Sequence, residues 1–300
     1  MSVGRGFNRF FFLFWFYFFA TVIPRPLQRI FTLAIGNLFY LLMPKSRSAV
    51  KKNLNLIAGE RWGKRQKAAI ARRTFQNYGQ YLLDYMVMHR VTADNKGKMV
   101  ERELGQEYMI EALGRGKGII CITPHLGNWE LGGLLLAFRG CDLYVLTLDE
   151  IDPKIKAFRE RMRATNRIKN IYIDPDDPSP AAVLEVLKIL KENNVVAMLG
   201  DRPGKANTIN LDFFGHHTRF PMGVATLAMA TGAAVLPVFV VLKKGGKYWG
   251  IIERPIYFQS SSRQDREQRI RRGMEELVGI FEKYIGEYPD QWYNFFPYWS

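Results

Sequence analysis

The stretch "TPHLGNWEL", Thr123 to Leu131, places an imidazole and a carboxylate five positions apart, at His125 and Glu130. A carboxylate that accepts the Nδ1–H of a histidine fixes the tautomer of the ring and leaves Nε2 free to take a proton from a hydroxyl. This pair predicts the base and the orienting acid of a catalytic triad whose nucleophile is the substrate's own hydroxyl. The alternative is a loop histidine followed by an ordinary charge in the first turn of a helix.

The elements around the motif must bring the two side chains together. The apolar run "GIICIT" predicts a strand that ends at Pro124, and Gly127-Asn128 predicts the start of a helix with Asn128 as its N-cap. Ligands of open α/β sheets bind at the carboxyl ends of the strands, which is where His125 falls.

Further along the chain, short β-branched runs alternate with helical patterns, which predicts an α/β fold with a mostly parallel, mixed central sheet flanked by helices. We expect strands at 118–123, 142–148, 170–174, 195–199, 234–242 and 248–256. We expect helices at 64–88, 128–138, 153–166, 180–193, 222–231 and 262–285.

Positive charge is concentrated in the first part of the chain. The 300 residues carry a net charge of +15, but residues 1–90 hold 15 basic and only two acidic side chains. A basic segment joined to a balanced remainder indicates an anionic partner. Nucleic acid, an anionic membrane surface and an acidic carrier protein all qualify; without a nucleic-acid-binding motif, we expect no nucleic acid.

Two apolar runs at the N-terminus favour the membrane. The run from Phe10 to Ile23 has 14 uncharged residues, and the run from Ile30 to Met43 is of similar length. Fourteen helical residues span roughly 21 Å, which is short for a hydrocarbon core of about 30 Å. We therefore expect residues 1–44 to form a hydrophobic membrane anchor and residues 45–300 to form a single α/β domain. A cleaved signal peptide and ordinary core helices are the alternatives.

Other polar residues are candidates for substrate binding. Asp201 and Arg202 follow the run "VVAML", so they belong at the carboxyl end of another strand, either as a phosphate and active-site contact or as a buried ion pair. Arg159 and Arg163 lie one helical turn apart, as a phosphate clamp or a solvated helix face. The two cysteines and four histidines have no metal-ligand spacing, so we expect no metal.

Together these segments resemble the bacterial lipid A biosynthesis acyltransferases, the lauroyl and myristoyl branch of the glycerolipid acyltransferases with their His-x4-Asp/Glu motif. The resemblance runs through nearly the whole chain in one order. It rests on six segments: "NLNLI" at Asn53, "RRTFQNYGQYLLDY" from Arg72, "HLGNWE" at His125, "GDRPG" at 200–204, the block from Phe213, and "DQWYNFF" at 290.

The resemblance implies a glycerolipid-acyltransferase-like fold and a catalytic domain on the cytoplasmic side of the bacterial inner membrane. Its activity is transfer of a fatty acyl group from acyl carrier protein or acyl-CoA to a hydroxyl of a membrane glycolipid, most simply a lipid A precursor, without a cofactor. His125 is the implied base and Glu130 its orienting partner. The residues that remain are assigned to substrate binding: Asn128, Trp129, Arg163, Asp201, Arg202, Arg219 and Gly223.

An oxyanion formed on the thioester needs hydrogen-bond donors, for which we expect the amides of 126–129, or Arg219 with the Gly223 turn. Three alternatives stay open for the activity. One is acylation of another polar lipid, such as a phosphatidylinositol mannoside; the second is thioester hydrolysis; the third is a non-catalytic membrane scaffold. The closing segment "QWYNFFPYWS" lacks the His and Arg that would hold acceptor phosphates.

Overall fold

The protein is described by a computed structural model that covers residues 17–18, 20–148, 152–173, 179–204, 207–258 and 263–299. Its centre is a seven-stranded sheet in the order β1-β9-β8-β2-β5-β3-β4. The strands are β1 (Val100–Leu104), β2 (Ile119–Thr123), β3 (Leu143–Thr147), β4 (Ile168–Tyr172), β5 (Val195–Leu199), β8 (Ala234–Leu242) and β9 (Tyr248–Ile252).

The sheet is mixed but mostly parallel. Strands β8, β2, β5, β3 and β4 run in one direction, whereas β9 is antiparallel to β8 and parallel to β1. The predicted α/β fold is therefore confirmed. An antiparallel hairpin of β6 (Thr208–Phe213) and β7 (His216–Pro221) stands apart from this sheet.

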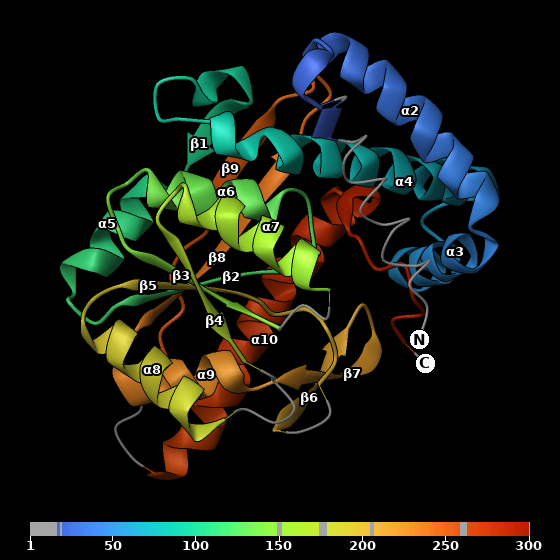
Figure 1. Ribbon diagram of the computed structural model, residues 1–300. Helices are drawn as coiled ribbons and strands as arrows, with labels where there is room; N and C mark the ends of the chain where they lie inside the picture. Colours follow the sequence, from blue (N-terminus) through green and yellow to red (C-terminus); the bar gives the residue numbers. More distant parts are fainter. Residues whose placement is uncertain are drawn as a thin grey trace.

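Helices cover both faces of the sheet (Figure 1). They are α5 (Gln106–Gly114), α6 (Trp129–Ala137), α7 (Pro153–Ala164), α8 (Pro180–Lys191), α9 (Gly223–Thr231) and α10 (Arg263–Glu287). The alternation of side chains along β2 explains the two layers. Ile120 and Ile122 pack with α8, α9 and α10, while Ile119 and Cys121 pack with α5 and α6.

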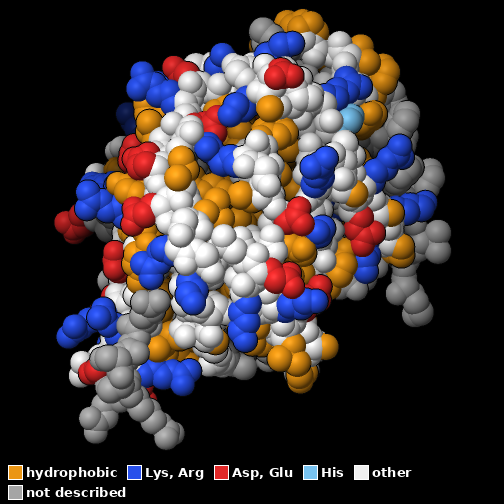
Figure 2. All heavy atoms as spheres, turned by 90° about the vertical axis from the view of Figure 1, so that its left-hand side faces the viewer, with side chains coloured by type: hydrophobic (Ala, Val, Ile, Leu, Met, Phe, Trp, Pro, Cys, Tyr) orange, Lys and Arg blue, Asp and Glu red, His pale blue; other side chains and the backbone are white. Residues whose placement is uncertain are grey.

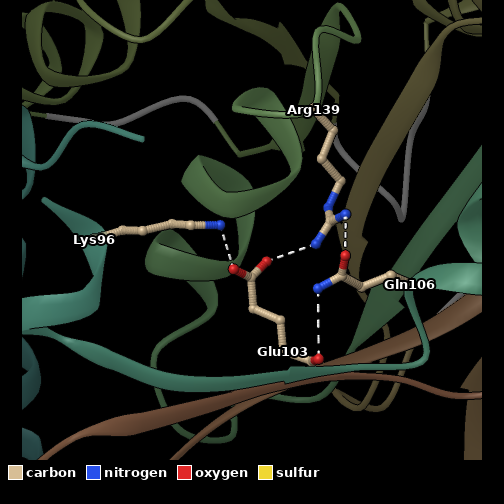
Figure 3. A network of polar contacts seen from close by, with 4 residues as sticks. All are labelled: Lys96, Glu103, Gln106 and Arg139. Carbon is tan, nitrogen blue, oxygen red and sulfur yellow. Dashed lines mark hydrogen bonds and ion pairs between the residues drawn. The ribbon is translucent and has the colours of Figure 1, made fainter. Parts of the chain in front are cut away.

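Polar contacts hold the edge strand β1 in place (Figure 3). The carboxylate of Glu103 accepts from Lys96 and, at 2.6 Å, from Nη2 of Arg139. Nη1 of Arg139 donates to Gln106 at 3.0 Å, and Gln106 donates back to the carbonyl of Glu103 at 3.5 Å. The network therefore ties β1 and the start of α5 to the end of α6.

The N-terminal helices α2 (Arg25–Leu42), α3 (Pro44–Ala58) and α4 (Lys64–Val87) lie together beside the sheet domain (Figure 1). Helices α2 and α4 approach closely at Gly36, where a Cβ would lie 2.6 Å from the Cα of Gln76. Thr32 and Gly36 of α2 are buried in this contact, whereas the buried amide of Gln28 donates to the carbonyls of Ala20 and Ile23.

Six large apolar side chains of α2 are exposed, whereas Phe31 and Phe39 pack against the buried clusters that α4 contributes to. Leu27, Ile30, Leu33, Leu38, Leu41 and Leu42 are between 40% and 66% exposed. Among the described residues, no single helix is long and apolar enough to cross a bilayer; Leu27–Leu42 and Pro44–Ala58 meet that test only as a pair bent by 96°. The predicted run from Phe10 to Ile23 lies largely outside the described residues. Whether residues 1–44 and 45–300 are separate units stays a prediction.

Candidate active site

His125 sits in the loop between β2 and α6, where the predicted strand and helix meet. The loop turns sharply at Gly127, whose φ is +63° and where a Cβ would lie 2.0 Å from the carbonyl oxygen of Val240. Only glycine fits this position. The backbone N–H of Tyr293 donates to the carbonyl of His125 at 2.8 Å, so the C-terminal segment holds the loop from its other side.

The imidazole of His125 contacts Asp201, with 2.6 Å between Nδ1 and Oδ1. The register of the sheet explains the contact. Strands β2 and β5 are parallel neighbours with Thr123 opposite Leu199, and each functional residue lies two positions beyond its strand. The shared carboxyl edge thus brings together two side chains that are 76 positions apart.

Asp201 is fully buried and surrounded by donors. Its Oδ2 accepts from Nε1 of Trp292 at 2.8 Å and from Nδ2 of Asn294 at 3.2 Å. Burial raises the pKa of Asp201, but the charge of His125 and the hydrogen bonds from His125 and Trp292 outweigh it and lower the pKa to about 2. Because the carboxylate is ionised and can only accept, Nδ1 of His125 carries the hydrogen, and Nε2 is the acceptor whenever the ring is neutral.

The predicted partner of His125, Glu130, has a different contact. Its Oε1 accepts from Nη2 of Arg163 at 2.7 Å and its Oε2 accepts from Nε of Arg163 at 3.2 Å. Glu130 lies in the first turn of α6 and Arg163 near the end of α7, so the ion pair joins two helices. The expectation that Glu130 orients the ring is therefore wrong: Asp201 occupies Nδ1, and the guanidinium fork takes both oxygens of Glu130.

Arg163 is not on a solvated helix face. It is 7% exposed, and its remaining Nη1 donates to Asn170 of β4 at 2.5 Å. Burial lowers the pKa of Arg163, but the charge and hydrogen bonds of Glu130 raise it above its usual value. The guanidinium thus donates to Glu130 and Asn170. Its predicted role as a phosphate ligand is not supported by these contacts.

His125, Glu130 and Arg163 line one cavity of about 1270 Å³ at the carboxyl edge of the sheet. Sites for drug-sized ligands usually enclose about 300–1,000 Å³, so this cavity is large. Its walls are mainly apolar and aromatic, with contributions from α4, α6, α7, α9 and the C-terminal segment. They include Tyr78, Tyr81, Tyr85, Trp129, Leu146, Phe158, Met198, Leu227, Tyr293 and Phe296.

The other predicted substrate-binding residues have distinct places. Trp129 lines the cavity, edge-on to His125 with 5.5 Å between ring centroids. Arg202 and Gly223 also line it, and the guanidinium of Arg202 stacks on Phe296 at 5.4 Å. Asn128 is buried as the N-cap of α6, where Oδ1 accepts from the amide of Leu131. Its position indicates a structural role.

Arg219 lies on the exposed side of β7 and is absent from the residues that line the cavity. Among the described residues, Asp201 has no ion pair with Arg202, so the interpretation of that pair as a buried salt bridge is wrong: Asp201 is fully buried on His125, whereas Arg202 is exposed.

The predicted oxyanion donors at 126–128 are already used. Leu126 donates to the carbonyl of Pro124, Gly127 to that of Gln291, and Asn128 to that of Val240. That part of the prediction is wrong. Trp129 and the Gly223 turn line the cavity, and the role of their amides as oxyanion donors stays a prediction.

The C-terminal residues that complete the site were not predicted as functional. Besides Trp292 and Asn294, the hydroxyl of Tyr298 donates to the carbonyl of Asp201. The signal was present in the "DQWYNFF" segment, whose indole and amide donors are unusual in an otherwise apolar tail. Among the described residues, no group of three or more His, Cys, Asp and Glu side chains is arranged to hold a metal.

Fold and site together define an α/β protein in which a histidine–carboxylate pair opens onto a large apolar cavity. The sequence profile of the family described as "Bacterial lipid A biosynthesis acyltransferase" matches residues 7–300. The chain belongs to this family and is an acyltransferase.

Two curated relatives are similar over most of their length, and both are named "Phosphatidylinositol mannoside acyltransferase". The protein from Mycobacterium tuberculosis (strain ATCC 25618 / H37Rv) is 25% identical over 228 residues, which are 75% of this chain and 69% of the relative. The protein from Mycolicibacterium smegmatis (strain ATCC 700084 / mc(2)155) is 25% identical over 234 residues, which are 77% and 72% of the two chains.

Proposed function

We propose that the protein transfers a fatty acyl group from an acyl thioester to a hydroxyl of a membrane glycolipid, with His125 as general base and Asp201 as its orienting carboxylate. The observation that carries this proposal is the His125–Asp201 contact at the wall of the cavity. An ionised partner on Nδ1 leaves Nε2 as the proton acceptor. The ring is 13% exposed, which leaves it accessible to a substrate in the cavity.

The reaction needs no enzyme nucleophile. Nε2 of His125 takes the proton of the acceptor hydroxyl while the hydroxyl oxygen attacks the thioester carbonyl carbon. The tetrahedral intermediate then collapses, the C–S bond breaks, and the thiolate takes the proton from the imidazolium. The charge of Asp201 stabilises that imidazolium, as the buried aspartate does in a serine-protease triad.

We assign Glu130 and Arg163 to the wall of the site. Their ion pair links the first turn of α6, which follows the His125 loop, to α7. A buried pair of this kind fixes the relative position of two elements and offers little free charge to a ligand. Glu130 therefore affects the reaction indirectly, by holding Arg163 and the shape of the cavity wall. Asp201 is the residue that contacts the base, His125.

The first candidate acceptor is a lipid A precursor, supported by the family that the chain belongs to. The second is a phosphatidylinositol mannoside, because both reported relatives carry that name. Mass spectrometry of lipids from cells with and without the gene distinguishes them. Loss of one acyl group from a disaccharide lipid supports the first, and loss from a mannosylated inositol lipid supports the second.

The donor is the thioester of acyl carrier protein or of coenzyme A. On the face shown in Figure 2, basic and acidic side chains are interspersed, without a field of one sign. Helices α3 and α4 and the turn between them instead expose seven basic side chains and the acidic side chain of Glu60; the basic residues are Lys45, Lys52, Arg61, Lys64, Arg65, Arg72 and Arg73. An acidic carrier protein suits this basic surface, so turnover with acyl carrier thioester should fall as salt rises more steeply than with acyl-CoA.

We further propose that α2 lies in the surface of an anionic membrane, on the cytoplasmic side of a bacterial inner membrane. Six of its large apolar side chains are exposed while Thr32 and Gly36 are buried against α4, a distribution that is unusual for the surface helix of a soluble protein. The basic residues of α3 add attraction to anionic lipids of about 1 kcal/mol each near the surface. Vesicle flotation tests this proposal. The triple variant Ile30→Ser, Leu38→Ser, Leu41→Ser should no longer float with the vesicles, and flotation equal to that of the wild type would refute the assignment.

The activity is tested with the purified full-length chain in vesicles that contain the acceptor lipid. His125→Ala should abolish transfer of a labelled acyl group, whereas a membrane scaffold would keep its cellular function in this variant. Free fatty acid released at the same rate with and without acceptor would identify a thioester hydrolase instead.

A further inference from the structure

Asn53, on the inner side of α3, is a buried amide that is not among the residues lining the cavity. It is 3% exposed and belongs to the segment "NLNLI". Apolar packing by Val50, Leu54 and Ala58 already holds α3 against α4. A polar side chain is not needed for that packing, and burying one costs free energy unless its hydrogen bonds are made.

The side chain of Asn53 makes three hydrogen bonds, all to the backbone of the C-terminal segment. Nδ2 donates to the carbonyl of Asn294 at 3.1 Å and to that of Phe296 at 2.9 Å. Oδ1 accepts from the backbone N–H of Tyr298 at 2.9 Å. One side chain thus fixes three backbone groups within five consecutive residues, so it sets the path of residues 294–298.

The same five residues carry contacts to Asp201. Asn294 donates from Nδ2 to Oδ2 of Asp201 at 3.2 Å, and Tyr298 donates from its hydroxyl to the Asp201 carbonyl. Trp292, two positions earlier, donates to the same Oδ2 at 2.8 Å. Trp292 and Asn294 occupy Oδ2 of the carboxylate and leave Oδ1 for the ring of His125, while Tyr298 holds the backbone of Asp201.

We propose that Asn53 is a positioning residue of the acyl transfer reaction: by bracing residues 294–298 it holds the donors that aim the carboxylate of Asp201 at His125. This inference rests on the proposed function, since it assigns the support of the same His125–Asp201 pair. It gives α3, an N-terminal helix that lies beside the central sheet, a part in supporting the His125–Asp201 pair.

Asn53→Ala removes all three contacts to the segment, and Asn55→Ala is the matched control. Asn55 lies one half-turn further along α3, is exposed, and its side chain has no hydrogen bond to a described residue. We expect Asn53→Ala to lower kcat roughly 10- to 100-fold, because a misplacement of about 1 Å near the chemistry can cost about 100-fold. KM should change less than about threefold, and Asn55→Ala should match the wild type.

A double-mutant cycle separates positioning from a general loss of structure. In an Asp201→Asn background the carboxylate that Asn53 serves is gone, so adding Asn53→Ala should leave kcat unchanged within about twofold. If kcat of Asp201→Asn is too low for a ratio to be measured in that background, Trp292→Phe, which removes one hydrogen-bond donor to Asp201, replaces it as the background. If Asn53→Ala does not fold, Asn53→Asp, which keeps the acceptor and the volume, replaces it.

The outcomes are distinct. An equal fall of kcat in both backgrounds, or a wild-type kcat in Asn53→Ala, overturns the role of Asn53 while the proposed function stands. A wild-type kcat in Asp201→Asn overturns the proposed site itself. Loss of the Asn53 effect in the Asp201→Asn background supports the positioning role.

Discussion

Replacing Glu130 by alanine should destabilise the protein strongly. The change removes the carboxylate that accepts two hydrogen bonds from Arg163 and leaves that guanidinium, 7% exposed, with Asn170 as its remaining described partner. Breaking a buried ion pair from one side costs about 3–5 kcal/mol because a charge is left uncompensated. At about 2–4 °C per kcal/mol for a large domain, Tm should fall by roughly 6–20 °C.

The measurement is thermal unfolding of the purified full-length chain, followed by tryptophan fluorescence. Glu111→Ala serves as the control, since Glu111 is an exposed glutamate of α5, and its Tm should stay within about 1 °C of the wild type. The double variant Glu130→Leu, Arg163→Met replaces both charges by apolar groups and should recover most of the lost stability. A Glu130→Ala protein as stable as the Glu111→Ala control would refute the assignment of Glu130 to a buried structural pair.

Three further predictions follow from contacts away from that pair. Because the pKa of Asp201 is about 2 in the folded protein and about 3.9 in an unfolded chain, its stabilisation is complete above about pH 4 and lost as the pH falls toward 2. The difference in unfolding free energy between the wild type and Asp201→Asn should therefore shrink by on the order of 2 kcal/mol across that window in acid titrations of denaturant unfolding; a constant difference would contradict the shift. Gly127→Ala should lower the free energy of unfolding by more than about 2 kcal/mol, since it adds a clash with Val240 to a strained φ. The control Gly140→Ala, where φ is +81° and the surrounding space is open, should lower it by only about 1 kcal/mol. Equal losses of Tm in the two variants would refute the clash. Burial raises the pKa of Cys121 to about 12, so iodoacetamide at pH 8 should label Cys141 and spare Cys121 in the native protein, and peptide mass spectrometry showing the reverse would contradict the burial.

Much of the fold follows from local pattern. The runs at 195–199 and 234–242 coincide with β5 and β8, because both are short, rich in β-branched residues and bounded by polar or glycine-containing turns. Strand β1 reads "VEREL", an edge strand with exposed charges that no apolar alternation marks. The β6–β7 hairpin was missed although "TINLDF" alternates polar and apolar residues before a glycine turn, because the partner strand "HHTRFP" opens with four polar residues and does not repeat that alternation.

The site was predictable only in part. Placing His125 and Asp201 each at the end of a strand needed no more than the apolar runs before them. That the two ends are neighbours depends on the strand order, in which β2 and β5 are adjacent although β3 and β4 come between them in sequence. Spacing along the chain therefore favoured Glu130, five residues away, over Asp201, 76 positions away.

The central claim is that Asp201, and not Glu130, orients the catalytic histidine. The most direct test is single-turnover transfer of a labelled acyl group by Asp201→Asn and Glu130→Gln at saturating donor and acceptor, each with its thermal stability measured in parallel. We expect Asp201→Asn to lose about 10³–10⁴-fold in rate, because an amide leaves the ring without a fixed tautomer or a countercharge. Glu130→Gln keeps hydrogen bonds to Arg163, so it should lose no more than about 100-fold together with stability. A larger rate loss in Glu130→Gln than in Asp201→Asn, with both proteins folded, would contradict the account.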